Sequence, residues 1–266
     1  MTMAPTSTVA DAGPPTALGP PKVPPAVPAA AALAWAAVIA LHVSGRGGSI
    51  DHDALLGPGG QPRVTSLLVY SAAWIAMVTA MMLPSAAPLV RLFAGVSRNQ
   101  ARTGLVVAAF VSGYLAVWTA FGWIALGVDA VVHTGVEASP WLDERPQLVA
   151  ASVLALAGAF QFSPLKDRCL HSCRHPGAYL LPRYRRGLRA AVRIGWSHGL
   201  FCLGCCWALM TVAFAVGMTD LRWTAAFTAL MTYEKLGPRG ETVARAAGVV
   251  LLTLAAMVAV QSTSVL

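Results

Sequence analysis

The sequence WSHGLFCLGCCWALMTVAFAVGM, residues 196–218, contains no Asp, Glu, Lys or Arg. A helix needs about 20 predominantly apolar residues to cross the hydrocarbon core of a bilayer, and this stretch reaches that length. Three cysteines and a histidine lie in its first half. The stretch therefore predicts a membrane-spanning helix that also carries groups able to bind a metal or to react.

Six further apolar segments have a similar composition. Two of them, 148–162 and 221–233, are short, and the second ends after 13 residues at Glu234. A segment of that length fits a re-entrant or partly buried helix as well as a full span. We therefore predict an all-α fold, a polytopic helical membrane protein with about seven (six to seven) transmembrane helices. The other four segments are 26–44, 67–83, 104–128 and 243–260.

The composition of the whole chain supports a membrane location. Hydrophobic residues make up 56% of the chain and charged residues 11%, whereas a soluble domain carries about a quarter charged residues. Residues 1–25 are rich in Pro, Ala, Thr and Gly and lack apolar periodicity, which predicts a disordered cytoplasmic tail. Residues 26–266 are predicted to form a single helical transmembrane domain.

The net charge of +8 is concentrated in one segment. Residues 163–195 contain eight Lys or Arg side chains against one acid, Asp167. Cytoplasmic loops of membrane proteins are enriched in Lys and Arg, so this basic loop is predicted to be cytoplasmic and to face lipid headgroups, not nucleic acid. The acidic residues within 129–144 then lie outside and the N-terminus lies inside. The predicted location is the inner (cytoplasmic) membrane.

All five cysteines lie within 38 residues, in or beside the basic loop. An odd number of thiols on the reducing side of a membrane argues against a disulfide framework and for ligands or redox groups. At 100° per residue, four residues of the 196–218 helix share an arc of about 100°, well inside the hydrocarbon. These four are His198, Cys202, Cys205 and Cys206.

A sulfur-lined site shielded from water has preferred metals. Thiolates and thioethers suit Cu(I) and Zn(II), and a dry site favours Cu(I) because a monovalent ion needs fewer anionic ligands for neutralisation. A single cysteine in an apolar helix is usually just a small hydrophobic side chain. Three cysteines within five positions favour a ligand role, so we expect Cu(I), with Zn(II) as the alternative.

A second group of candidate ligands lies in the basic loop: Cys169, His171, Cys173 and His175. In a helix the two cysteines would align at i and i+4 and the two histidines would lie on the opposite face. An irregular loop could instead bring all four together, although the spacing is too tight for the usual zinc fingers. The simpler model combines Cys169 and Cys173 with the membrane cysteines and leaves the histidines secondary.

Two methionines and one acid complete the candidate ligands. Met81 and Met82 lie at the cytoplasmic end of segment 67–83, at the predicted level of the cysteines, and a thioether is a further Cu(I) ligand. Methionine is equally common as core filler. Glu234 follows segment 221–233, at a boundary where charges are usually surface anchors.

Four strings carry a resemblance to a known family: MMLPSAAP from Met81, FQFSPLKDRCLHSCRHP from Phe160, GLFCLGCCWALM from Gly199 and EKLGPRGE from Glu234. In this order they resemble the predicted metal-binding integral membrane proteins called domain of unknown function 2182, over about 67–260. The resemblance implies a multi-pass metal-binding protein, and some members are labelled as copper chaperones. Carried over motif by motif, it implies roles for Met81, Met82, Cys169, Cys173, Cys202, Cys205, Cys206 and Glu234, while His171, His175 and His198 lie beside the motif positions.

The function we expect is copper handling: the protein would accept, store, deliver or transport Cu(I) at the inner face of the membrane. Its expected partners are the lipid bilayer, the metal ion and a soluble metal donor or acceptor or a membrane partner protein. The chain has no phosphate-cradling motif, which argues against ATP-driven transport. One alternative is an enzyme, an intramembrane thiol-disulfide oxidoreductase in which Cys202 and Cys205 exchange electrons with Cys169 or Cys173. Another is a structural membrane subunit.

Overall fold

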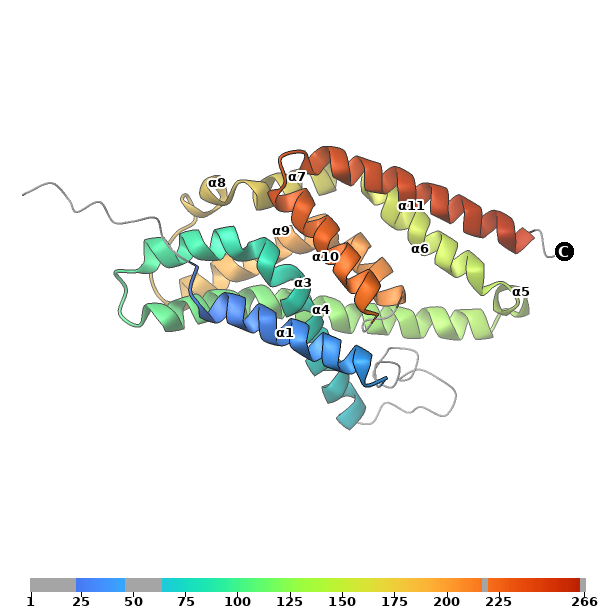
Figure 1. Cartoon of the computed structure of the whole chain (residues 1–266), viewed down its shortest axis with the longest axis horizontal. Helices are drawn as coiled ribbons and strands as arrows, with labels where there is room; N and C mark the ends of the chain where they lie inside the picture. The colour runs from blue at the N-terminus through green and yellow to red at the C-terminus, as the bar shows by residue number, and fades with distance from the viewer. Residues whose placement is uncertain (1–22, 46–63, 217–219, 264–266) are drawn as a thin grey trace, which may run out of the picture.

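The computed structural model describes residues 23–45, 64–216 and 220–263. The predicted tail, residues 1–25, lies almost wholly outside the described residues. All regular structure in the described part is helical, which confirms the predicted fold class (Figure 1). The helices are α1 (Ala26–Val43), α3 (Val64–Ser97), α4 (Thr103–Glu137), α5 (Pro140–Asp143), α6 (Pro146–Phe160), α7 (Pro164–Arg174), α8 (Pro176–Leu180), α9 (Leu188–Ala215), α10 (Leu221–Leu236) and α11 (Gly240–Thr263).

The number of candidate membrane spans in the described residues is five, or six if one bent pair counts as a span. The five are α1, α3, α4, α9 and α11, and the bent pair is α6 with α7. The helix predicted at 221–233 is present as α10, but its 16 residues are too few for a full apolar span. The count therefore reaches the lower end of the predicted six to seven only if the bent pair is one span.

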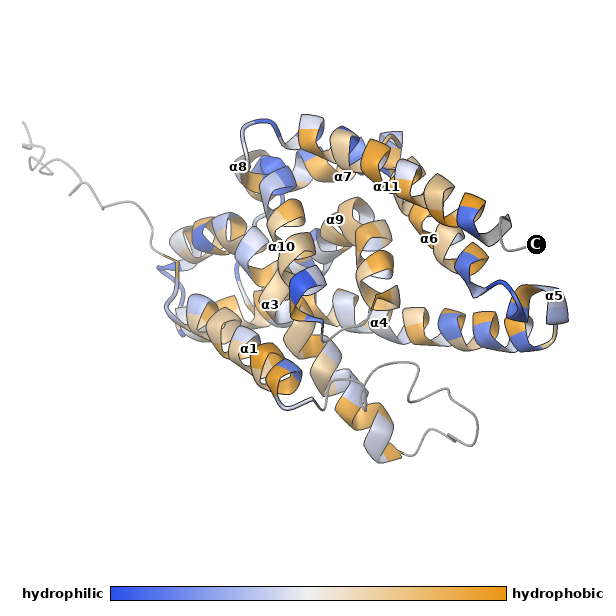
Figure 2. Ribbon diagram, turned by 45° about the vertical axis from the view of Figure 1, so that its right-hand side comes forward, coloured by the Kyte–Doolittle hydropathy of each residue, from blue (hydrophilic) through white to orange (hydrophobic). Residues whose placement is uncertain are grey.

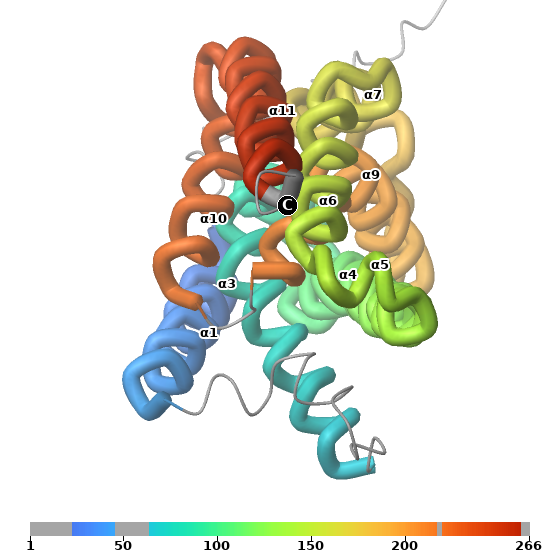
Figure 3. Tube along the Cα trace, turned by 90° about the vertical axis from the view of Figure 1, so that its right-hand side faces the viewer, coloured from blue at the N-terminus to red at the C-terminus, as the bar shows by residue number. Residues whose placement is uncertain are grey.

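The long helices run roughly along the long axis of the molecule (Figure 1). α4 packs along α9, α11 along α6, and α1 along α3. The view down the long axis shows α11 beside α6 (Figure 3). α7, α6 and α10 also contact α9. The cysteine-bearing helix is thus surrounded by protein.

The outer helices keep large apolar side chains exposed. Leu33 and Val43 on α1 and Val260 on α11 are each more than 60% exposed, and Figure 2 shows both helices coloured largely as hydrophobic. Extended exposed apolar surface of this kind marks contact with a membrane. Together with the five or six candidate spans, it identifies the chain as a multi-pass membrane protein.

α4 and α9 approach closely because glycines remove side-chain bulk where they touch. A Cβ on Gly113 of α4 would clash with the backbone carbonyl of Val192, and one on Gly195 of α9 would clash with the carbonyl of Phe110. Small residues permit such contacts between membrane helices. The close contact brings Tyr114, the residue after Gly113, within reach of the α9 cysteines.

α3 continues through Pro84 and Pro88 and ends at Ser97. Proline lacks an N–H, so Pro84 cannot donate to the carbonyl of Ala80 four residues earlier. The indole Nε1 of Trp35 on α1 donates to that carbonyl instead, at 3.1 Å. α3 bends near its middle (Figure 1), as interior prolines require. The bend and the Trp35 contact fix α1 against the part of α3 that carries the two methionines.

A bend of 63° separates α6 from α7. The side chain of Ser163 caps α7 by accepting a hydrogen bond from the backbone N–H of Lys166 at 3.1 Å, and Pro164 begins the helix. Both residue types are favoured at these positions. The segment 163–195, predicted as a basic loop, is largely helical, since it contains α7, α8 and the start of α9. The bend lays α7 against α9 and α10.

Candidate metal site

Four thiols from two helices meet in the core, and we call them the thiol cluster: Cys173 of α7 with Cys202, Cys205 and Cys206 of α9. The Sγ of Cys205 lies 3.3 Å from the Sγ of Cys206 and 3.9 Å from the Sγ of Cys173. The Sγ of Cys205 also donates a hydrogen bond to the backbone carbonyl of Cys202 at 3.1 Å. All four are free thiols, and the three on α9 are buried. Two segments far apart along the chain thus supply one group of sulfur atoms.

The Sγ of Cys202 is contacted by polar groups from α4 and α10. The hydroxyl of Tyr114 lies 3.1 Å from its Sγ, and the ammonium of Lys235 donates to the same sulfur at 3.1 Å. The ammonium also donates to the hydroxyl of Ser85 at 3.0 Å and lies 3.7 Å from the Sδ of Met82. A neighbouring cation favours the thiolate over the thiol, and the thiolate is the form that binds metals.

Glu234 is buried next to Lys235 but is held by other groups. Its Oε2 accepts a hydrogen bond from the ammonium of Lys166 at 2.7 Å, and both side chains are almost wholly buried. Its backbone carbonyl accepts from the guanidinium of Arg174 at 2.6 Å. The structure therefore places this predicted ligand in an ion pair that joins α10 to α7.

The two predicted methionines are both fully buried. The thioether of Met82 lies beside Lys235 and therefore close to Cys202. Met81 packs in the same hydrophobic core as the cysteines of α9. Of the two, Met82 is the one whose sulfur the described contacts bring to the cluster.

His198 is buried one helical turn before Cys202, on the same side of α9. Its ring stacks on that of Tyr114, with 5.6 Å between ring centroids, and lies 5.4 Å from the ring of Tyr179. Its Nδ1 has no hydrogen-bond partner among the described residues. A buried imidazole nitrogen without a partner, held beside the thiols by two aromatic rings, is available as a further donor.

For the remaining candidates, the described residues show no sulfur contact with the thiol cluster. Because α7 is helical, Cys169 and Cys173 share one face and the two histidines share the opposite face. The Sγ of Cys169 packs against Gly204, since a Cβ there would lie 2.5 Å from it. His171 and His175 are exposed, with ring centroids 4.2 Å apart. The structure thus brings Cys173 to the membrane cysteines and leaves both histidines at the surface.

The Sγ of Cys205 contacts two other sulfurs, those of Cys173 and Cys206. In the part of the chain that the structure describes, no three His, Cys, Asp or Glu side chains are grouped as the ligands of one metal ion. A structural zinc site needs four ligands around one point. Soft thiolate and thioether donors select Cu(I), which a pair of thiolates can hold. The sulfur donors present are therefore of the soft kind that Cu(I) prefers.

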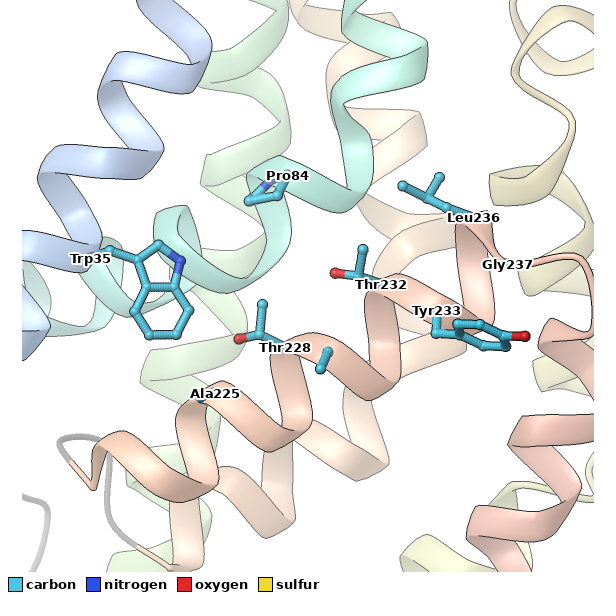
Figure 4. Close-up of a pocket in the computed structure, with 9 residues that line it drawn as sticks. Trp35, Pro84, Ala225, Thr228, Thr232, Tyr233, Leu236 and Gly237 are labelled. Carbon is cyan, nitrogen blue, oxygen red and sulfur yellow. The ribbon is translucent and has the colours of Figure 1, made fainter.

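A cavity of about 590 Å³ lies between α1, α3 and α10 (Figure 4). Its lining is mostly apolar, and the cysteines are absent from it. It is therefore separate from the candidate metal site. The lining residues are Trp35, Pro84, Ala225, Thr228, Ala229, Thr232, Tyr233, Leu236 and Gly237.

Two neighbours of Cys202, Tyr114 and Lys235, are missing from the predicted site residues. Ser85, which accepts a hydrogen bond from Lys235, is missing as well. The sequence does give a signal for Lys235. A charge in an apolar helix is costly unless it is paired, and Lys235 directly follows a second charge, Glu234. Tyr114 and Ser85 carry no such signal. Their place at the site depends on how α3 and α4 pack against α9.

Comparison with known protein families gives a match over more than half of the chain. Residues 71–258 match the model of a family described as PpoB2, copper chaperone. No curated protein and no solved structure matches the chain. The matched range contains the whole thiol cluster with Tyr114 and Lys235.

Proposed function

Since this chain belongs to the PpoB2 copper chaperone family, we propose that it accepts Cu(I) on the thiol cluster within the membrane and passes it to a partner. The cluster, Cys173 with Cys202, Cys205 and Cys206, supplies the main ligands. The thioether of Met82 and the imidazole of His198 are the further donors closest to it. One observation carries the proposal: the Sγ of Cys205 lies within 3.9 Å of a thiol from α7 and a second thiol on α9.

Exchange of copper between partners needs ligands that can be reached from one side. Cys173 is half-buried, whereas the three α9 thiols are buried. It lies on α7, beside the exposed histidines and the basic residues of segment 163–195. We propose that this segment faces the cytoplasm and that a soluble copper donor or acceptor, or a membrane partner, exchanges the ion through Cys173.

The same thiol contacts are also compatible with a second candidate function. The Sγ atoms of Cys173 and Cys205 are 3.9 Å apart, close enough that a small shift would allow a disulfide between α7 and α9. A thiol-disulfide oxidoreductase would use such a pair. The two functions differ in what the purified protein holds: bound copper with free thiols, or a reversible disulfide without metal.

The test is metal content. The full-length protein is purified in detergent under reducing, oxygen-free conditions and loaded with Cu(I), and bound metal is measured by mass spectrometry. We expect near-stoichiometric copper in the wild type and its loss when Cys202, Cys205 and Cys206 are all changed to Ser. The matched control is Cys169→Ser, which removes a thiol outside the cluster and should keep its copper.

Two outcomes would reject copper handling. The first is a wild type that retains no Cu(I) above the triple variant. The second is a wild type without metal whose Cys173 and Cys205 form a disulfide on mild oxidation, which would favour the oxidoreductase.

A further inference from the structure

Lys235 is a buried cation whose neighbours are mostly sulfur. Its side chain is 4% exposed, and its ammonium contacts the Sγ of Cys202, the Oγ of Ser85 and the Sδ of Met82. Removing an ammonium from water is costly unless an opposite charge lies close to it. The charge that compensates Lys235 must therefore be found nearby.

The adjacent carboxylate does not serve as its partner. Glu234 is paired with Lys166 at 2.7 Å, so these two buried charges cancel one another. Among the described residues no carboxylate forms a salt bridge with Lys235. The nearby group that can carry a negative charge is the thiolate of Cys202, whose Sγ lies 3.1 Å from the ammonium. The anionic charge that balances Lys235 therefore comes from the thiol cluster.

We propose that Lys235 is the counter-ion of the copper–thiolate centre and sets its preference for a monovalent metal. This inference rests on the proposed function, since it concerns the same thiol cluster. Cu(I) held by two thiolates has one net negative charge, and the ammonium of Lys235 makes the buried assembly neutral. Zn(II) held by two thiolates is neutral already, so the same ammonium leaves one uncompensated positive charge.

Removing the ammonium should therefore shift the metal preference of the site from Cu(I) toward Zn(II). Without it, a buried bis-thiolate Cu(I) carries an uncompensated negative charge, whereas bis-thiolate Zn(II) becomes neutral. Zinc could also reach neutrality beside the ammonium by recruiting a third thiolate. The Sγ of Cys205 has two other thiols within 3.9 Å, but among the described residues no three Cys, His, Asp or Glu side chains are arranged to hold one metal ion. The geometry therefore favours the two-thiolate assignment.

The experiment compares Cu(I) and Zn(II) binding by four variants of the full-length protein with the wild type. Lys235→Met and Lys235→Gln remove the charge, and the amide of the second keeps a hydrogen-bond donor toward Ser85. Lys235→Arg keeps the charge. Arg222→Met is the matched control, because it removes one positive charge from an exposed position on the same helix. Affinities are measured by competition with a Cu(I)-specific chelator and with a zinc indicator, and size-exclusion profiles check folding.

We expect both neutral variants to lower the ratio of Cu(I) affinity to Zn(II) affinity by about tenfold or more, because an unbalanced buried charge is costly. Lys235→Arg and Arg222→Met should keep the wild-type ratio. The proposal is overturned if either neutral variant folds and keeps the wild-type affinity ratio. It is also overturned if Lys235→Arg, which keeps the charge, loses affinity for both metals as much as Lys235→Met does. A wild type that binds no Cu(I) rejects the proposed function itself, a result distinct from an unchanged ratio in the variants.

Discussion

Among the individual residues, Cys205 holds the central position of the thiol cluster. Its Sγ is within 3.9 Å of Cys173 and within 3.3 Å of Cys206. Its sulfur also donates to the backbone carbonyl of Cys202 at 3.1 Å. It therefore links the thiol on α7 to the other two on α9, and its loss would separate them.

We expect Cys205→Ser to weaken Cu(I) binding by about 10- to 100-fold, the range that disturbance of a metal site typically produces. Serine keeps the size of the side chain but replaces a soft sulfur donor with a hard oxygen. Affinity is measured by competition with a chelator of known Cu(I) affinity. Cys169→Ser should bind as the wild type does. Equal losses of Cu(I) affinity in the two variants would show that the thiol cluster is not the binding site.

The cysteines could be found from the sequence because their chemistry and their helical spacing are both local. The arc shared by His198, Cys202, Cys205 and Cys206 follows from 100° per residue on one helix. Whether Cys169 or Cys173 meets that arc depends on the bend between α6 and α7, which no local pattern specifies. The same holds for Lys235, whose contacts come from helices distant in sequence.

At the scale of helices, the contact of α4 with α9 determines whether Tyr114 reaches Cys202. This contact depends on backbone surfaces exposed by glycine. Gly195→Ala would push a methyl group into the carbonyl of Phe110. Because backbone cannot move aside as a side chain can, we expect a loss of stability of about 1–3 kcal/mol or more, the usual cost of overpacking.

The matched control for this prediction is Gly127→Ala. Gly127 lies on α4, the helix that packs along α9, but nothing is within 4 Å of a Cβ placed there. Alanine is the better helix former by about 1 kcal/mol, so this variant should be neutral or slightly more stable. Thermal unfolding in detergent measures both. If Gly195→Ala unfolds at the wild-type temperature, α4 and α9 do not pack as closely as described.

The attachment of α7 to α10 depends on a buried ion pair. Glu234→Gln would leave the ammonium of Lys166 buried without its partner, and breaking such a pair by removing one member costs about 3–5 kcal/mol. Replacing both, as Lys166→Met with Glu234→Leu, leaves no charge to compensate and should recover much of that loss. Unfolding temperatures of the single and double variants provide the measurement. A double variant no more stable than Glu234→Gln would argue against a charge effect.

Most helices could be predicted because long apolar segments set their own length. α7 and α8, in the segment predicted as a loop, are exceptions, and so is α10. Its apolar run ends at Glu234 and Lys235, and the sequence left both a span and a partly buried helix open. Tertiary contacts decide the outcome, because Lys166 and Arg174 on α7 and Cys202 on α9 bind this charged end in the core.

In the whole molecule, charge is divided between two ends of the helix bundle. Figure 1 shows α8 near one end and α5 with the C-terminal helix end near the other. The exposed arginines that follow α8 include Arg183, Arg185 and Arg186, whereas exposed Asp143 and Glu144 belong to the end near α5. The excess of Lys and Arg on cytoplasmic loops predicts that the α8 end lies inside and the α5 end outside.

This orientation decides from which compartment copper would be exchanged, because Cys173 lies close in sequence to α8. We expect a protease site inserted after Arg185 to be cut only when protease is added to inside-out vesicles. A site inserted after Ser139 should be cut only in right-side-out vesicles, and immunoblotting of the fragments gives the readout. The two insertions control for one another, since each must resist cleavage in the preparation that exposes the other. The reversed pattern would place Cys173 at the outer face, and copper exchange would then have to take place with a partner outside the cell.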